Sequence, residues 1–359
     1  MPSVIIPKAL DPGATIAFIS PSARLNDQYP AVISRATAVL KGRGYNVREF
    51  YNKDTGIQSS ITNRISELRA AFVDPEVSAI ICTIGGPAFT ELLPGLIADT
   101  DLHSIIRANP KIVVGYSDIT GLHWFLHALT GLRTFYGPGV IPELGASEAV
   151  DDESLPLAFC IKHLFRAIAD RQPIGDVPRS PTYAHKHPSW FLDPASIHKT
   201  ELVPTPGWIW LRPGKAQGRL FGGCLSVMAR LSGVRPIVPD WRGRIVFFET
   251  ATGEKFGTGN PIDRVKAGIA DLIAQGVFEE AAGLVVGRPF GYDSTKQREK
   301  YISVIKGLLC DGPLSKREFP ILFNVDVGHT TPMVTLPFDA LAILDSEKDQ
   351  FAIQESGVI

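Results

Sequence analysis

Short apolar runs alternate with segments of helical periodicity through the first third of the chain. The apolar runs predict buried strands at residues 15–20, 45–50, 79–84 and 111–114. Segments with one apolar face predict helices at residues 31–41, 61–73 and about 119–130. Continuous apolar strands separated by helices are typical of a parallel sheet covered on both faces. We therefore predict an N-terminal α/β domain over residues 1–140.

The periodic pattern is lost between residues 137 and 215, where prolines are frequent and one helix is expected at 155–169. A connection of this length usually carries function or joins domains. Beyond it, strands are expected at 244–249, 283–287, 320–325 and 334–336, and helices at 225–231, 261–274 and 297–310. We predict a linker or insertion over residues 141–214 and a smaller C-terminal α/β domain over residues 215–359.

Composition narrows the class of protein without identifying it. The 359 residues are 45% hydrophobic and 20% charged, with a formal net charge of -1, so we expect a folded protein with no nucleic-acid or membrane footprint. The four cysteines are widely spaced, which indicates neither a zinc site nor a disulfide framework. The N-terminus lacks the pattern of a secretory signal, and we predict a cytoplasmic protein.

Ser117 stands where the β-branched strand run at 111–114 stops and a helical pattern begins. A sharp strand-to-helix turn holds a hydroxyl out of the sheet, which is how a nucleophile elbow works. The local motif, Gly115-x-Ser117-x-Ile119, lacks the second glycine of the usual elbow. Ser117 could instead cap the helix, a role that Asp118 could also fill. The pattern alone leaves nucleophile and cap open.

A serine nucleophile needs a general base, which directs attention to the eight histidines. His123 and His127 share one helix face, but no zincin glutamate follows His123, so we interpret them as packing residues. His185 and His187 lie in the proline-rich connection and are expected to be exposed. His103, His163 and His198 have no neighbours that suggest chemistry.

His329 differs because it directly follows the predicted strand at 320–325 and stands beside Gly328. Loops after strands are where sheet proteins place reactive groups, although an ordinary surface histidine fits the same pattern. A catalytic imidazole also needs a carboxylate to orient it. Glu249, at the end of a very apolar strand, is the first candidate, with Asp326 a competitor and Glu254 weaker.

Paired glycines, Gly85-Gly86, end the third predicted strand. They let backbone amides approach a ligand closely, and one such amide could pair with that of Asp118 as an oxyanion hole. The alternative is a turn that needs a positive φ. The segment that follows is not G-x-G-x-x-G, so dinucleotide binding is not indicated.

Several of these motifs, taken together and in order, resemble the LD-carboxypeptidase family of serine peptidases. The match runs from about residue 13 to residue 345. It rests on Ile84-Gly-Gly with Glu91-Leu-Leu-Pro94, Gly115-Tyr-Ser-Asp-Ile-Thr120, Thr134-Phe-Tyr-Gly-Pro138, Gly218-x-Leu-x-Gly-Gly223, the strand ending in Glu249, and Gly328-His329-Thr.

The resemblance implies a Ser-Glu-His triad at Ser117, Glu249 and His329, and an oxyanion hole built from the backbone amides of Gly86 and Asp118. It implies a flavodoxin- or amidotransferase-like N-terminal domain and a swivelling-type C-terminal domain. It also implies a homodimer that needs neither metal nor cofactor.

We therefore expect a hydrolase that cleaves an amide or peptide bond through an acyl-enzyme. The expected substrate is a small peptide with a free carboxyl end, of the L-D type found in murein. Peptidyl-aminoacyl nucleotides of the microcin kind are the alternative. A catalytically silent peptide binder is a further possibility, as is a cysteine amidotransferase-like enzyme, for which Cys82 is poorly placed.

Substrate contacts are harder to predict than the triad. Trp208 and Trp210 could supply a stacking face, or could be a core or interface pair. Family members commonly have Asn-Ser-Asn after the first paired glycines, where this chain has Pro87-Ala88-Phe89. They commonly have asparagine where this chain has Cys224. Both departures border the expected pocket, so we expect specificity to differ there.

Overall fold

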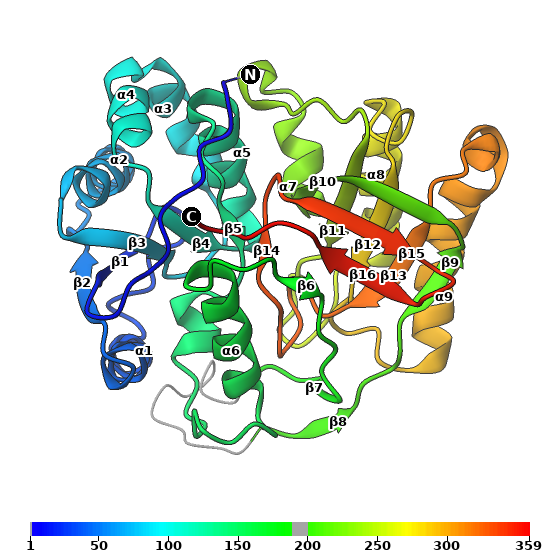
Figure 1. Cartoon of the computed structure of the whole chain (residues 1–359), viewed down its shortest axis with the longest axis horizontal. Coiled ribbons are helices and arrows are strands. Elements are labelled where there is room, and N and C mark those ends of the chain that lie inside the picture. Colours follow the sequence, from blue (N-terminus) through cyan, green and yellow to red (C-terminus); the bar gives the residue numbers. More distant parts are fainter. Residues whose placement is uncertain (1, 189–199) are drawn as a thin grey trace.

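The computed structural model describes residues 2–188 and 200–359. Figure 1 shows two sheets side by side, the N-terminal one on the left and the C-terminal one on the right. The first has six strands in the order β14-β5-β4-β3-β1-β2, and the second has eight in the order β6-β16-β15-β10-β11-β12-β13-β9. A two-stranded sheet, β7 (Thr182–Ala184) with β8 (Leu202–Pro204), lies in the connection between them.

The first sheet confirms the predicted parallel arrangement. Its parallel strands are β1 (Thr15–Ile19), β2 (Asn46–Phe50), β3 (Val77–Cys82), β4 (Ile112–Gly115) and β5 (Phe135–Tyr136). Strands β1 and β4 are buried along their whole length, as their continuous apolar runs require. The order 2-1-3-4-5 is that of a flavodoxin-like doubly wound sheet.

Helices cover both faces of this sheet. In Figure 1 they lie above and below it, α2 to α5 on one side and α1 and α6 on the other. Their bounds are α1 (Pro30–Gly42), α2 (Ile57–Val73), α3 (Leu93–Ala98), α4 (Thr100–Ala108), α5 (Thr120–Thr130) and α6 (Pro156–Ile168). Helix α5 is buried on nearly every side because it also contacts α7 (Leu225–Leu231) of the C-terminal part.

The second sheet has a parallel centre of β10 (Lys215–Cys224), β11 (Arg244–Glu249), β12 (Gly283–Gly287) and β13 (Ile321–Val325). Antiparallel strands extend it on both sides: β9 (Ile209–Arg212), β15 (Leu341–Asp345), β16 (Gln350–Ile353) and β6 (Gly175–Asp176). Its remaining helices include α8 (Ile262–Ala274) and α9 (Thr295–Ile305). With eight strands against six, this sheet is larger than predicted.

The two sheets are joined closely. Gly223, at the end of β10, has a φ of +142°, and a Cβ there would come within 2.3 Å of the Thr120 side chain of α5. The indole of Trp124 on α5 donates a hydrogen bond of 2.9 Å to the Gly222 carbonyl. In addition, β14 (Leu336–Pro337) crosses from the C-terminal part to pair with β5. This packing brings the carboxyl ends of β4, β11 and β13 to one cavity.

Among the described residues, no helix is long and apolar enough to cross a lipid bilayer.

Candidate active site

Ser117 occupies a strained turn between β4 and α5. Its φ is 64°, in the left-handed region that residues other than glycine rarely adopt. Hydrogen bonds hold the backbone there: the Ser117 N–H donates to the Tyr136 hydroxyl at 3.0 Å, and the Thr120 hydroxyl donates to the Ser117 carbonyl at 2.6 Å. A strained, firmly held serine after a strand is the geometry of a nucleophile elbow.

The capping alternative receives no support from the structure. Within the described part of the chain, no side chain caps the N-terminus of α5. The Asp118 carboxylate instead accepts hydrogen bonds from the Phe89 N–H at 2.7 Å and the Ser22 hydroxyl at 2.5 Å, and it also pairs with Arg230. Asp118 therefore fixes the loops around Ser117 rather than the helix end.

His329 and Glu249 form a buried pair across the second sheet. The Nδ1 of His329 lies 2.7 Å from Glu249 Oε2, and the His329 backbone N–H donates to the same oxygen at 3.1 Å. The Glu249 side chain has no exposed surface, and that of His329 is 13% exposed. The contact leaves Nε2 of the ring as the nitrogen that can face a substrate.

The pair changes the protonation behaviour of both residues. Burial alone would lower the pKa of His329, but the Glu249 charge and hydrogen bond outweigh it and hold this pKa above its ordinary value. Burial alone would raise the pKa of Glu249, but the His329 charge and hydrogen bond, with the Tyr136 hydroxyl, hold that pKa below its ordinary value. The charge on each side chain therefore favours the ionised form of the other.

Among the described residues, neither of the other two carboxylate candidates bonds to the His329 ring. Asp326 is fully buried but forms an ion pair with Arg288 and accepts a hydrogen bond from the Ser180 N–H at 3.0 Å. Glu254 is largely exposed and pairs with Arg264 at 2.8 Å. Although Asp326 is only three residues from His329, its carboxylate pairs with Arg288 and Ser180, whereas the Glu249 carboxylate contacts the ring.

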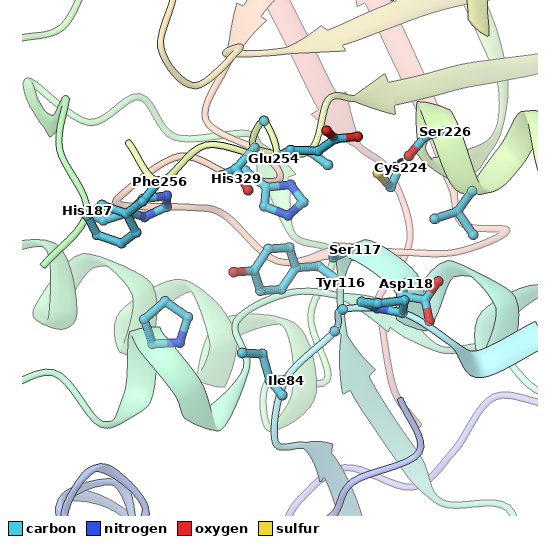
Figure 2. A pocket seen from close by; sticks show the side chains of 18 of the residues that line it. Ile84, Tyr116, Ser117, Asp118, His187, Cys224, Ser226, Glu254, Phe256 and His329 are labelled. Atoms are coloured by element: carbon cyan, nitrogen blue, oxygen red, sulfur yellow. Dashed lines mark hydrogen bonds between the residues drawn. The ribbon is translucent and has the colours of Figure 1, made fainter. Parts of the chain in front are cut away.

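Ser117 and His329 line one cavity of about 530 Å³. Figure 2 shows them at its centre, with the aromatic rings of His187 and Phe256 toward one end and Asp118 toward the other. Among the described residues, the Ser117 hydroxyl makes no hydrogen bond to the His329 ring. Catalytic hydrogen bonds are often long before substrate binds and tighten in the complex.

The predicted oxyanion residues border the same cavity. Gly86 and Asp118 both line it beside Ser117, and Gly86 has a φ of +85°. The Ser22 hydroxyl contacts the Gly86 carbonyl oxygen as well as the Asp118 carboxylate. Ser22 thus links the two segments whose amides were predicted to hold an oxyanion.

Sequence reasoning missed two tyrosines at this site. Tyr136, fully buried, accepts from the Ser117 N–H and donates to Glu249 Oε1 at 2.6 Å, so it bridges serine and carboxylate. The ring of Tyr116 packs edge-on against the His329 ring at 5.1 Å, and its hydroxyl donates to Glu143 at 2.8 Å. Burial raises the pKa of Glu143 to about 7. The motif Thr134–Pro138 contains Tyr136, but nothing in its pattern indicates the bridge.

The histidine predictions had mixed outcomes. His123 and His127 are buried in α5, where His123 bonds Thr134 at 2.8 Å, which confirms their packing role. The prediction that His185 and His187 are exposed was wrong, because both are half-buried. The His187 ring stacks on Phe290 at 4.2 Å and lines the cavity. His198 lies outside the described residues.

Of the two interpretations of Trp208 and Trp210, a stacking face or a core or interface pair, the structure favours the second, because both rings pack against the core. Within the described residues, neither indole lines the cavity. Arg179 packs over the Trp208 ring at 3.7 Å, and the Trp210 indole donates to Asp349 at 2.8 Å. Both belong to the β9 edge of the second sheet, because β9 pairs with β13 there instead of forming a loose connection.

Cys82 does not offer a thiol nucleophile. It lies in β3 with no exposed surface, and burial raises its pKa. Cys224 is likewise buried at the cavity wall, with a raised pKa. In the described ranges, no group of three or more histidine, cysteine or carboxylate side chains is placed to hold a metal ion.

Comparison with known proteins decides the family. Residues 16–137 match the LD-carboxypeptidase N-terminal domain, and residues 217–344 match the LD-carboxypeptidase C-terminal domain. A probable murein peptide carboxypeptidase of Bacillus subtilis is 30% identical, with 98% of this chain and 95% of the relative aligned. The chain belongs to the LD-carboxypeptidase family.

Other LD-carboxypeptidase family relatives extend over nearly the whole chain. The microcin C7 self-immunity protein MccF of Escherichia coli is 28% identical, covering 96% of this chain and 94% of MccF. A solved MccF structure in complex with aspartyl sulfamoyl adenosine has a TM-score of 0.83 at 26% identity, covering 99% of this chain and 100% of MccF. The predictions of the family, the fold class and a peptidase are confirmed.

Proposed function

We propose that this LD-carboxypeptidase family member is a serine hydrolase in which Ser117 attacks, His329 accepts the serine proton, and Glu249 orients and stabilises the imidazolium. The observation that carries the proposal is the 2.7 Å contact between His329 Nδ1 and Glu249, in the cavity that Ser117 also lines. That contact fixes the ring tautomer and leaves Nε2 for the serine.

The reaction runs in two halves. The Ser117 oxygen bonds to the scissile carbonyl carbon, while its proton passes to His329 Nε2 and the carbonyl oxygen becomes an oxyanion beside the Gly86 and Asp118 amides. When the carbon–nitrogen bond breaks, His329 returns the proton to the leaving amine. Water, activated by the same ring, then hydrolyses the acyl-enzyme and frees Ser117.

The proposed substrate is a small peptide with a free carboxyl end, of the L-D murein type. The murein peptide carboxypeptidase relative supports this class, and an open cavity of about 530 Å³ suits a ligand of a few residues. We further propose that the protein acts as a homodimer, which sedimentation velocity would test.

A second substrate class is favoured by the MccF neighbours, whose structures hold aspartyl sulfamoyl adenosine and adenosine monophosphate. The rings of His187 and Phe256 at one end of the cavity are suited to stack on a base. Parallel assays of an L-D dipeptide and aspartyl sulfamoyl adenosine would separate the two classes by their kcat/KM values.

The mechanism is tested by labelling with a fluorophosphonate probe. Wild-type protein should be labelled on Ser117 and lose activity, while Ser117→Ala should neither be labelled nor turn over substrate. A Ser226→Ala variant is the matched control, because Ser226 lines the same cavity but has no proposed part in the chemistry. Labelling of Ser117→Ala at the wild-type rate would contradict the proposal.

A further inference from the structure

The cavity carries a fixed positive charge on the Asp118 side of Ser117. Among the described residues that line it, Arg230 of α7 is the one arginine or lysine. Its side chain is 44% exposed, although its guanidinium forms an ion pair with Asp118 Oδ1. Arginine has five N–H donors, and Asp118 uses one of them within the described part of the chain. The remaining donors are available to a ligand.

The position of this charge relative to Ser117 is set by Asp118. Asp118 directly follows Ser117, and its carboxylate is held by the Ser22 hydroxyl and the Phe89 N–H. Because Arg230 binds that anchored carboxylate, its guanidinium lies next to the nucleophile turn. Planar guanidinium groups match carboxylates through paired hydrogen bonds, so a carboxylate is the ligand chemistry that this group favours.

The cavity is therefore chemically polarised. The aromatic rings of His187 and Phe256 lie toward one end, and Asp118, with which Arg230 forms an ion pair, lies toward the other. Burial lowers the pKa of His187 to about 4, so this ring is uncharged at neutral pH, and the carboxylate of Glu254, which also lines the cavity, is paired with Arg264. A peptide lying across Ser117 would meet apolar surface on one side and a cation on the other.

We propose that Arg230 binds the terminal carboxylate of the residue that leaves, and so restricts cleavage to the last bond of the peptide. The inference rests on the proposed function of the same site. The terminal carboxylate is one residue beyond the last scissile carbonyl, a span of about 3.5 Å along the chain. Arg230 is placed at a similar short remove from Ser117, because it forms an ion pair with Asp118, the residue after the nucleophile. Longer leaving segments would place their carboxylate beyond Arg230.

The test compares a peptide acid with its amide. For wild-type protein, N-acetyl-L-lysyl-D-alanine should have a KM roughly 10- to 100-fold lower than its C-terminal amide, the range of one charge-assisted hydrogen-bonded pair. In Arg230→Met the two KM values should converge to within about threefold. Arg230→Lys, which keeps the charge but not the planar fork, should discriminate to an intermediate degree.

Arg235→Met is the matched control, because Arg235 is exposed, lies outside the cavity lining and loses the same charge. It should keep wild-type discrimination. If Arg230→Met slows acid and amide equally, Arg230 serves only to hold Asp118 and the inference is wrong. A wild-type protein that does not distinguish acid from amide would also overturn it.

Binding measurements keep this test separate from the proposed mechanism. Calorimetric titration of Ser117→Ala with the two peptides measures their affinities, and so the recognition of the carboxylate, without turnover. A preference for the acid that disappears in Ser117→Ala/Arg230→Met supports the inference even if Ser117 proves not to be the nucleophile. Equal affinities for acid and amide in Ser117→Ala refute it even if Ser117 is labelled by the probe.

Discussion

Tyr136→Phe removes one oxygen atom from the bridge between the strained serine and the buried carboxylate. The change leaves the Ser117 N–H without its 3.0 Å acceptor and Glu249 Oε1 without its 2.6 Å donor. Glu249 is fully buried and Ser117 is half-buried, so the expected loss of unfolding free energy is about 2–4 kcal/mol. At roughly 2.1 cal/mol/K per residue over 359 residues, this corresponds to a Tm lower by about 3–5 °C.

Activity should fall further than stability alone explains. The elbow backbone and the Glu249 carboxylate both lose a fixed contact, and misplacement at a reacting centre costs roughly 10- to 100-fold in kcat. The KM should change little, because Tyr136 lies beneath the cavity floor and does not line it. Steady-state kinetics and calorimetry on the same preparations measure the two effects.

Tyr301→Phe provides the matched control. Tyr301 is also fully buried, and its hydroxyl contacts Thr250, the residue after Glu249, at 3.3 Å. This variant should lose about 0.5–1.5 kcal/mol of stability and keep wild-type kcat. The bridging role would be refuted if Tyr136→Phe retained wild-type kcat, or if both variants lost kcat equally.

Three further outcomes follow from the same contacts. Wild-type kcat/KM should rise with pH through an apparent pKa above the ordinary 6.5 of histidine, because His329 must be neutral to accept a proton. In Glu249→Gln the pKa of His329 is set mainly by burial, so the rise of kcat/KM with pH should move below 6.5. The kcat of this variant should fall roughly a thousandfold. Gly328→Ala should displace the Glu249 side chain, because the added Cβ would lie 2.0 Å from Glu249 Cγ at a φ of +87°. We expect a lower Tm, measured by circular dichroism, together with a lower kcat. Arg288→Met should lower the unfolding free energy by about 3–5 kcal/mol in urea titrations, because Asp326 would remain buried and unpaired; an unchanged midpoint would contradict this.

The sequence predicts much of this fold because its strongest signals are local. Buried parallel strands such as β4 and β11 are continuous apolar runs, and the break at Ser117 appears directly in the residue pattern. The strands β15 and β16 were missed because they are short and their apolar and polar residues alternate weakly. The pairing of β15 with β10, and of β16 with β15, supplies the stability that their own residues do not indicate.

The same difference between local and long-range signals applies to the site residues. Ser117 could be placed from its turn, but the choice of Glu249 over Asp326 depends on Arg288, which lies in a distant loop and neutralises Asp326. His187 was taken as exposed because prolines surround it, yet its ring packs on Phe290 from another segment. Contacts between distant segments decide these cases, and single-chain periodicity carries no information about them.

The two-residue pairing of β14 with β5 limits how a ligand can enter. The loop that carries His329 leaves the second sheet at β13 and is anchored in the first sheet only a few residues later. Swinging the halves apart would break that anchor and separate Ser117 of the first half from the His329–Glu249 pair of the second. We therefore expect substrate to enter the open cavity without separation of the halves, and heating should melt both halves in a single calorimetric transition.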